Sequence, residues 1–522
     1  MQELIIGRQW KFILINIFFW SGFFSVVITV FAPSFGLCPS VFDGQGLRRS
    51  HTLLVGCVML LTSIYYIRYW KIPFWRFWSE LFSYLINHRT MPPIFFIMVF
   101  AVHLLSPVVM SSDSRWTIPT ALSIIKEGNT DLDEYQHEPD FNNHYAIKLT
   151  RGHYYSIFPI GTSIIAVPFI LSFILFDVPV LHEISWLSNY YIGLHRDMYQ
   201  HQSALLSWYW FIEIVIASII ISCVAGIVYV IARQTLRQSH ALLVAFIFAF
   251  CTSTWSTCSR ALWSHTPSML MLTITLYLLL LSKTHPQVLA FTSIPLSCAF
   301  IFRPTNSLLI MTISLWILIW QRKYFFRYLF YSLPVAVFFI IYNFSVYHKI
   351  ISPYYQPQRI AVSSNFFEGL VGTLLSPSRG LFIFTPIFLL SLYGMYWKWK
   401  SSLFEIFDYI LLCTLMLHWL VISSFPAWWG GGSYGPRLFS DTIPFFVYFL
   451  IPYIQYIAKS QGLRKYAIVS VFIIFLLISL WMHYRGATSW ETAFAWNCVP
   501  NDIDLYHSRV WDWHDPQFLR GF

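Results

Sequence analysis

Residues 204–232 read ALLSWYWFIEIVIASIIISCVAGIVYVIA, and Glu213 is the only charged side chain among them. A helix needs about 20 consecutive apolar residues to cross the hydrocarbon core of a bilayer. This stretch exceeds that length and carries almost no charge. It therefore predicts a membrane-spanning helix.

The composition of the whole chain agrees with this one stretch. Of its 522 residues, 57% are hydrophobic and only 11% are charged, and the mean hydropathy is +0.59. A soluble globular domain carries about 25% charged residues. These proportions exclude a soluble enzyme, a disordered chain and a nucleic-acid-binding protein, although the net charge is +10.

Similar apolar stretches recur along the sequence and predict an all-α polytopic membrane protein. Residues 161–181 are also apolar, but Pro168, Asp177 and Pro179 interrupt them, so we expect an interfacial or re-entrant helix there. The first stretch is too long for a cleavable signal peptide. About thirteen spans are expected, near 12–32, 52–69, 93–110, 204–232, 241–256, 267–282, 288–302, 305–320, 328–343, 380–397, 406–424, 442–458 and 466–482.

The charges favour one orientation of these spans. With the N-terminus in the cytoplasm, the inner side has 17 of the 33 Lys and Arg residues and four acids, whereas the outer side has 16 basic and 18 acidic residues. This distribution follows the positive-inside rule and predicts a multi-pass protein of the plasma (inner) membrane. The long polar segments then lie on the outer face, so we expect the active site there.

The same layout divides the chain into three parts. Residues 1–92 contain two leading spans and, at 70–92, a basic aromatic segment that is typical of an amphipathic helix on the inner membrane surface. Residues 93–482 form the main helical module, whose first outer loop covers 111–203. Residues 483–522 are a tail on the outer face.

A carboxylate follows the third predicted span directly. Residues 111–135 read SSDSRWTIPTALSIIKEGNTDLDEY, which predicts a membrane-surface helix with Ile118, Leu122 and Ile125 on its apolar face. At the mouth of a membrane cavity, the Asp113 carboxylate would be partly desolvated and therefore a stronger base. The alternative is that Ser112 or Asp113 only caps the helix.

A glycine-rich loop lies between two later spans. Residues 428–441 read WWGGGSYGPRLFSD, and the glycines allow the backbone to approach a ligand closely. The two tryptophans, Trp428 and Trp429, offer ring faces to a sugar or an isoprenoid chain, and the planar fork of Arg437 suits a phosphate. The alternative is an interfacial aromatic belt with a flexible turn.

Three further arginines, Arg260, Arg303 and Arg379, lie at predicted outer ends of spans. An arginine near hydrocarbon is costly unless it is paired, so several on one side predict an anionic ligand at the membrane boundary. For each one alone, snorkelling to the lipid headgroups is the alternative. His265, close to Arg260 in the sequence, is a further candidate for substrate binding.

The remaining candidates belong to the first outer loop. Asp133 and Glu134 are either substrate-binding acids or part of a solvated acidic loop. His153 and Tyr154, in RGHYYSIFP at 151–159, are expected in a turn that leads into the interfacial helix, with ligand contact as the alternative. Glu213, an acid inside a span, is either functional or paired with an arginine of a neighbouring helix.

These segments resemble one family. The position of Asp113 after a span, the sequence EGNTD at 127–131 and the sequence GHYYSIFP at 152–159 resemble the first outer loop of the GT-C glycosyltransferases. Within that superfamily, the chain is most similar to the lipid A aminoarabinose transferases and the protein O-mannosyltransferases. The arginine motifs and the glycine-rich loop resemble a bacterial branch. The resemblance covers roughly residues 93–460.

The resemblance implies a GT-C-type helix bundle with juxtamembrane helices on the outer face, and a membrane enzyme that uses a polyprenyl-phosphate sugar donor. The acceptor would be a hydroxyl of a glycan, lipid or protein, and one displacement would invert the anomeric centre. Asp113 takes the place of the catalytic base. Arg115 takes that of the arginine for the carrier phosphate, and the further phosphate-binding candidates are Arg303, Arg379 and Arg437.

Two points stay open under this resemblance. Ser114 stands where the better-known enzymes have a second acid, so Asp133 or Glu134 is left to supply it. Use of a divalent metal is therefore undecided, and no other cofactor is implied. The expected substrate-binding residues are Asp133, Glu134, His153, Tyr154, Arg260, His265, Trp429 and Tyr434.

Two other functions are compatible with the sequence. A polysaccharide polymerase or ligase of the envelope would hold a long glycan on basic outer segments such as 344–379. A transporter or flippase for lipid-linked sugars would also be polytopic. It predicts internal repeats and breaks near the centres of spans, and the one-sided polar loops disfavour it.

Overall fold

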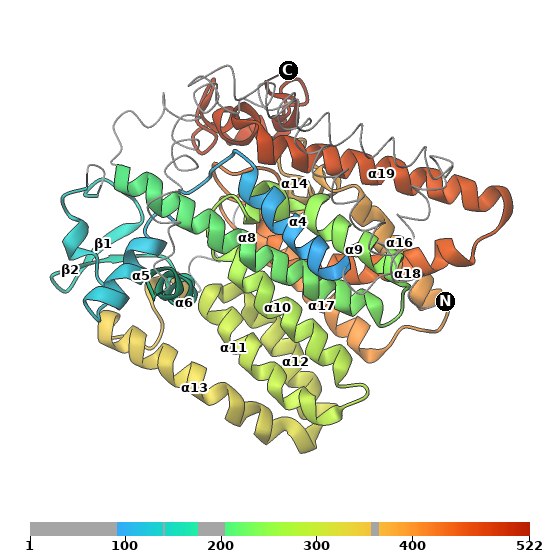
Figure 1. Cartoon of the computed structure of the whole chain (residues 1–522), viewed down its shortest axis with the longest axis horizontal. Coiled ribbons are helices and arrows are strands. Elements are labelled where there is room, and N and C mark those ends of the chain that lie inside the picture. Colours follow the sequence, from blue (N-terminus) through green and yellow to red (C-terminus); the bar gives the residue numbers. More distant parts are fainter. Residues whose placement is uncertain (1–90, 139–140, 176–203, 357–364, 522) are drawn as a thin grey trace, which may run out of the picture. The chain divides into compact units, whose positions relative to one another are not determined.

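The computed structural model describes residues 91–138, 141–175, 204–356 and 365–521 (Figure 1). The predicted spans at 12–32 and 52–69 and nearly all of the segment at 70–92 lie outside the described residues. Residues 92–177 and 203–522 belong to one compact unit.

The described part of the chain is mostly helical, as its composition predicts. The helices of the first half are α4 (Met91–Leu105), α5 (Thr117–Lys126), α6 (Gly161–Leu175), α8 (Ala204–Arg233), α9 (Gln238–Phe250), α10 (His265–Leu281), α11 (Ser293–Phe302), α12 (Ser307–Trp320) and α13 (Arg322–Tyr347). Those of the second half are α14 (Phe366–Leu375), α15 (Leu381–Phe384), α16 (Ile387–Lys400), α17 (Ile406–Ser423), α18 (Ile443–Lys459), α19 (Gly462–Thr488) and α20 (Trp496–Cys498).

Five helical segments are long and apolar enough to cross a membrane: Trp208–Arg233, Arg322–Tyr347, Ile406–Ser423, Arg437–Lys459 and Gly462–Thr488. The other six spans predicted within the described residues coincide with shorter helices. Prolines explain why two of these helices, α4 and α11, are short. Helix α4 ends two residues before Pro107, and α11 ends at Phe302 because Arg303 precedes Pro304 and is extended.

Two of the long helices expose their apolar side chains to the surroundings. Phe326, Phe330 and Ile341 of α13 and Ile474 and Leu477 of α19 are all more than 40% exposed. These two helices run along opposite edges of the helix array in Figure 1. Exposed apolar surface of this extent is expected where a helix faces lipid.

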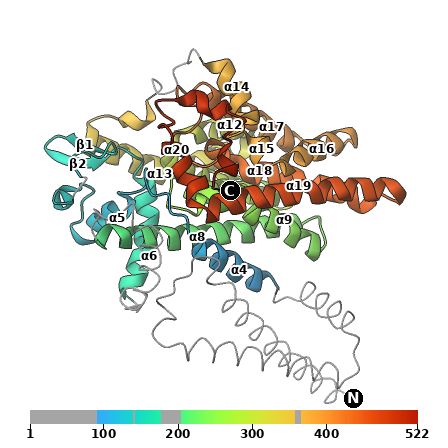
Figure 2. The same ribbon diagram turned by 90° about the horizontal axis from the view of Figure 1, so that it is seen from above.

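The core of the unit lies around α18. This helix is buried along most of its length and packs against α16, α8, α9 and α10 (Figure 2). Gly394 of α16 permits the closest approach, because a Cβ at this position would lie 2.2 Å from the backbone oxygen of Phe449. The sequence thus uses a small residue where two apolar helices meet.

The described residues also contain one β-hairpin. Strands β1 (Ile147–Thr150) and β2 (His153–Ser156) pair antiparallel, with Lys148 opposite Tyr155. The turn consists of Arg151 and Gly152, which both have positive φ, as a two-residue hairpin turn requires. His153 and Tyr154 are therefore in a strand, and their predicted position in a turn is wrong.

The C-terminal residues belong to the same unit. Helix α19 continues past the boundary predicted at 482 and ends at Thr488. Beyond it, Trp496 and Val510 are fully buried, and the Trp511 side chain donates a hydrogen bond to Glu368 near the start of α14. The tail is thus packed against the start of α14.

Candidate active site

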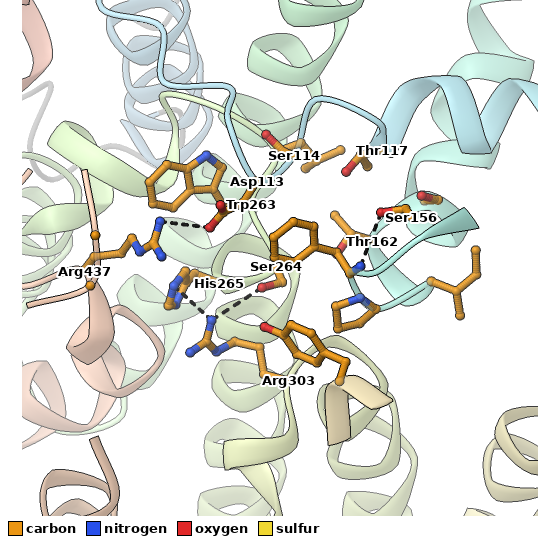
Figure 3. A pocket seen from close by; sticks show the side chains of 18 of the residues that line it. Asp113, Ser114, Thr117, Ser156, Thr162, Trp263, Ser264, His265, Arg303 and Arg437 are labelled. Atoms are coloured by element: carbon orange, nitrogen blue, oxygen red, sulfur yellow. Dashed lines mark hydrogen bonds and ion pairs between the residues drawn. The ribbon is translucent and has the colours of Figure 1, made fainter. Parts of the chain in front are cut away.

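A cavity of about 560 Å³ lies where several separated segments of the chain meet. Its size falls in the range of small-molecule binding sites. Figure 3 shows polar side chains around it from the segment after α4, the hairpin region, the start of α10, the end of α11 and the glycine-rich loop. The candidates that line it are Asp113, His265, Arg303, Trp429 and Arg437.

The Asp113 carboxylate has two partners in this cavity. Its Oδ2 atom lies 3.0 Å from a guanidinium nitrogen of Arg437 (Figure 3). The Tyr145 hydroxyl donates to its Oδ1 atom at 2.5 Å. Asp113 does not cap the following helix, because the N-cap residue of α5 is Trp116, without a side-chain hydrogen bond. The carboxylate therefore faces the cavity, and the capping alternative is wrong.

The Arg437 guanidinium is held from a second side by Trp263. It lies 4.4 Å from the centre of the Trp263 ring, a cation–π arrangement. The indole N–H of Trp263 donates to the Met110 carbonyl at 2.9 Å, which fixes the ring beside the Asp113 loop. The Nε atom of Arg437 is buried and has no hydrogen-bond partner among the described residues. The guanidinium that carries this atom lines the cavity.

A second arginine forms a buried cluster at the same cavity. The Nε atom of Arg303 lies 2.7 Å from Asp441 Oδ2, and its Nη1 atom donates to His265 Nε2 at 2.9 Å. Because His265 Nε2 accepts this bond, its ring is neutral, with its proton on Nδ1, which lies 3.4 Å from Asp441. The extended backbone of Arg303, set by Pro304, directs this arginine toward α10.

The glycine-rich loop forms another wall. Gly430 and Gly431 line the cavity and have φ angles of 75° and 67°, which favour glycine. The indole N–H of Trp429 donates to Asp504 Oδ1 at 2.8 Å, and its ring stacks on His507 at 5.1 Å. Asp504 also lines the cavity, so the C-terminal tail contributes to its wall.

Arg379 and Arg260 lie elsewhere and bind other parts of the protein. Arg379 is 2% exposed and donates to side-chain oxygens of Gln517 and Asn497 and to the carbonyls of Trp429 and Gly431. Burial lowers the pKa of Arg379 to about 9, so it is still protonated at neutral pH. Arg260 is fully buried and donates to carbonyl oxygens at the end of α4 and beyond it.

Three further candidates contact other parts of the protein; Tyr434 and Arg115 are buried, and Glu134 is exposed. Tyr434 is fully buried, and its hydroxyl donates to the Met482 carbonyl at 2.7 Å. The guanidinium of Arg115, a residue only 7% exposed, lies 5.7 Å from the centre of the Trp116 ring. Glu134 accepts a hydrogen bond from the Ser123 hydroxyl. These three are not among the residues that line the cavity.

Asp133, His153 and Tyr154 lie together at the hairpin. Asp133 Oδ2 is 2.6 Å from His153 Nδ1, and Asp133 Oδ1 accepts the backbone N–H of Tyr154 at 2.8 Å. Asp131, Asp133 and His153 bring three possible metal-ligand atoms within 4.8 Å of one another. Exposed acidic groups often come together in this way without an ion, so the use of a divalent metal stays a prediction.

Several residues of the site were not predicted. Tyr145 has no sequence pattern that marks it. Asp441 immediately precedes a predicted span. A carboxylate at the end of a span needs a partner, and this requirement could have predicted a pair between Asp441 and an arginine. Glu213 pairs with no arginine among the described residues. It accepts hydrogen bonds from the Ser111 hydroxyl at 2.8 Å and from the Leu262 backbone N–H at 3.0 Å. It thereby joins the two loops that carry Asp113 and Trp263.

A comparison with models of known protein families gives no match, and no curated protein is significantly similar to the chain. Function is therefore inferred from the cavity and from the residues around it.

Proposed function

We propose that the protein is an integral membrane glycosyltransferase that moves a sugar from a polyprenyl-phosphate carrier to an acceptor hydroxyl at the outer face of the plasma membrane. The observation that supports this most strongly is the Asp113–Arg437 pair at 3.0 Å, which joins residues 324 positions apart in the wall of one cavity. A carboxylate beside arginines provides both a base and a site for a phosphate.

The arginines suit the leaving group of this reaction. When the bond between the anomeric carbon and the carrier phosphate breaks, negative charge develops on the phosphate, and fixed cationic donors stabilise it. Arg437 has a donor without a partner in the described structure, and Arg303 lies in the same cavity. The phosphate leaves as an anion, so it needs no proton from the protein.

Asp113 suits the acceptor side of the reaction. The acceptor oxygen forms a bond to the anomeric carbon, its proton passes to the Asp113 carboxylate, and the carbon–phosphate oxygen bond breaks with inversion. Before substrate binds, Arg437 and Tyr145 each engage one oxygen of this carboxylate. Binding of the donor phosphate to Arg437 would weaken the ion pair and make Asp113 a stronger base.

Mass spectrometry of lipid-linked sugars and envelope glycans tests the proposal. A deletion strain is complemented with wild type, with Asp113→Asn, or with Glu127→Gln, which removes an exposed acid at the end of α5. We expect a polyprenyl-phosphate monosaccharide to accumulate in the deletion strain and one glycan to lose a single sugar. Wild type and Glu127→Gln restore both, whereas Asp113→Asn loses about 10²–10⁴ in rate, the usual contribution of a general base.

The other outcomes separate the alternatives. Loss of a long polymer, instead of a single sugar, would favour a polymerase or ligase. Unchanged profiles in the deletion strain, or full complementation by Asp113→Asn, would contradict the transferase and favour a transporter.

A further inference from the structure

A second, smaller cavity lies beside the first. It has a volume of about 240 Å³ and is lined by the hairpin, the C-terminal end of α13 and the short 3₁₀ helix η8 (Pro353–Tyr355). Ser156 and Tyr354 line both cavities. The two cavities are therefore neighbours that share a wall.

Three tyrosines line this second cavity. Tyr155 comes from β2, Tyr347 from the end of α13 and Tyr354 from η8. Thr150 and Ser156 add two hydroxyl groups. Tyrosine combines an apolar ring face with a polar tip, and a sugar ring likewise has apolar faces and polar edges. The lining therefore matches one sugar unit.

One cation completes the lining. Lys148 stands opposite Tyr155 in the hairpin register, so both side chains project from the same face of the hairpin. No carboxylate is among the described residues that line this cavity. An ammonium group in this position suits the carboxylate or phosphate of an acidic ligand.

The walls of the cavity are held in place by the protein. Arg151, in the hairpin turn, donates to the Ser345 carbonyl of α13 at 2.8 Å. Tyr355 of η8 donates to the Ile301 carbonyl of α11 at 2.5 Å. A cavity that is formed before the ligand arrives requires less ordering of the protein on binding.

We propose that this second cavity is an acceptor subsite, which binds an acidic sugar unit next to the unit whose hydroxyl reacts at Asp113. The inference rests on the proposed glycosyltransferase function. The reacting unit occupies the main cavity, which is the larger one that contains Asp113. The acceptor passes the wall formed by Ser156 and Tyr354. Its next unit contacts the tyrosines of the second cavity and places its acid group on Lys148. The acceptor class is then an anionic glycan, free or attached to a lipid.

Saturation-transfer NMR with the purified full chain in detergent tests this subsite. The compounds are glucose, glucuronate and glucose 6-phosphate, which separate a carboxylate from a phosphate. The variants are Lys148→Gln and, as a control, Lys126→Gln, an exposed lysine outside both cavities. We expect wild type and the control to bind at least one acid about fivefold more tightly than glucose. Lys148→Gln should bind all three alike, with its affinity for glucose unchanged.

Two results would overturn the proposal. The first is a wild-type protein that prefers neither acid over glucose. The second is a preference for an acid that persists in Lys148→Gln, which would assign the preference to the arginines of the main cavity. Tyr347→Leu provides a second measurement, and it should weaken binding of all three sugars by a similar factor because the ring is lost. Unchanged binding in this variant would also contradict the subsite.

The binding measurement requires no sugar transfer, so its result is independent of the proposed reaction. Acid preference that depends on Lys148, together with full complementation by Asp113→Asn, would leave the acidic-sugar site in place and remove the transferase. Complementation that depends on Asp113, together with no preference for an acid, would support the transferase and remove the acidic-sugar site.

Discussion

Four arginines at the ends of apolar stretches fall into two groups that differ in their partners. Arg437 and Arg303 line the main cavity, and each lies within 3.0 Å of a carboxylate, from Asp113 and Asp441 respectively. Arg379 and Arg260 are almost completely buried, and their hydrogen bonds go mainly to neutral backbone and amide oxygens.

This difference separates arginines that can bind a ligand from arginines that hold the protein's own loops in place. Hydrogen bonds between a buried guanidinium and neutral protein oxygens cannot be broken without a large loss of stability. Such an arginine therefore fixes the loops around it. A guanidinium that lines a cavity and pairs with a partly exposed carboxylate, as Arg437 does with Asp113, can exchange that partner for a phosphate. Arg303 also lines the cavity, but its partner Asp441 is buried. All four arginines lie at the ends of apolar stretches, and their partners distinguish the two groups.

The largest effect that would test this comparison is expected for Arg437→Gln. Loss of one preorganised donor to the developing phosphate charge should lower the rate of sugar transfer by about 10²–10³. The melting temperature should change little, because the Asp113–Arg437 pair is partly exposed. Mass spectrometry of the transferred sugar and thermal unfolding in detergent give the two readings.

Arg464→Gln is the matched control, since Arg464 is exposed and donates to the Tyr456 hydroxyl. A transfer rate for Arg437→Gln equal to that of this control would remove Arg437 from the site.

Arg379→Met should show the reverse behaviour. Several buried oxygens would lose their donor, at a cost of about 1–3 kcal/mol for each one left unsatisfied. We expect a clearly lower melting temperature and less folded protein, while the activity per folded molecule falls much less than in Arg437→Gln. If Arg379→Met is as stable as wild type but inactive, the assignment of Arg379 to structure is wrong.

Tyr145→Phe is expected to have the smallest effect of the three. Partial burial and then the Asp113 carboxylate raise the pKa of Tyr145, so the phenol stays protonated at neutral pH and donates to Asp113. Its loss should change the transfer rate about 3- to 10-fold.

Because the phenol stays protonated, wild type and Tyr145→Phe should both keep their activity on the alkaline side of neutral pH. An alkaline loss of activity in wild type that is absent from Tyr145→Phe would show that Tyr145 itself exchanges a proton in the reaction.

Helices could be predicted from the sequence because they depend on local apolar length, as in 204–232 and 406–424. Their ends were harder to predict, since α4 and α11 stop at prolines that lie within or beside apolar stretches. The hairpin at 147–156 was missed because its turn, Arg151 and Gly152, has no strong signal beyond one glycine.

The site was only partly predictable. Asp113, Arg303 and Arg437 are recognisable as ionisable residues at the ends of apolar stretches. Their partners are not, because Tyr145 lies in an irregular loop and the Asp113–Arg437 pair spans 324 positions. Arg379 has a sequence context similar to that of Arg303, and only the tertiary structure shows that Gln517 and Asn497 occupy its guanidinium.

The most direct test of the central claim uses the lipid that accumulates in the deletion strain as donor. Release of free polyprenyl phosphate is measured for the purified full chain in liposomes, with wild type, Asp113→Asn and Glu127→Gln side by side. We predict equal release by wild type and Glu127→Gln, and release about 10²–10⁴ slower with Asp113→Asn at an unchanged melting temperature. Release by Asp113→Asn at the wild-type rate would contradict the assignment of Asp113 as the base.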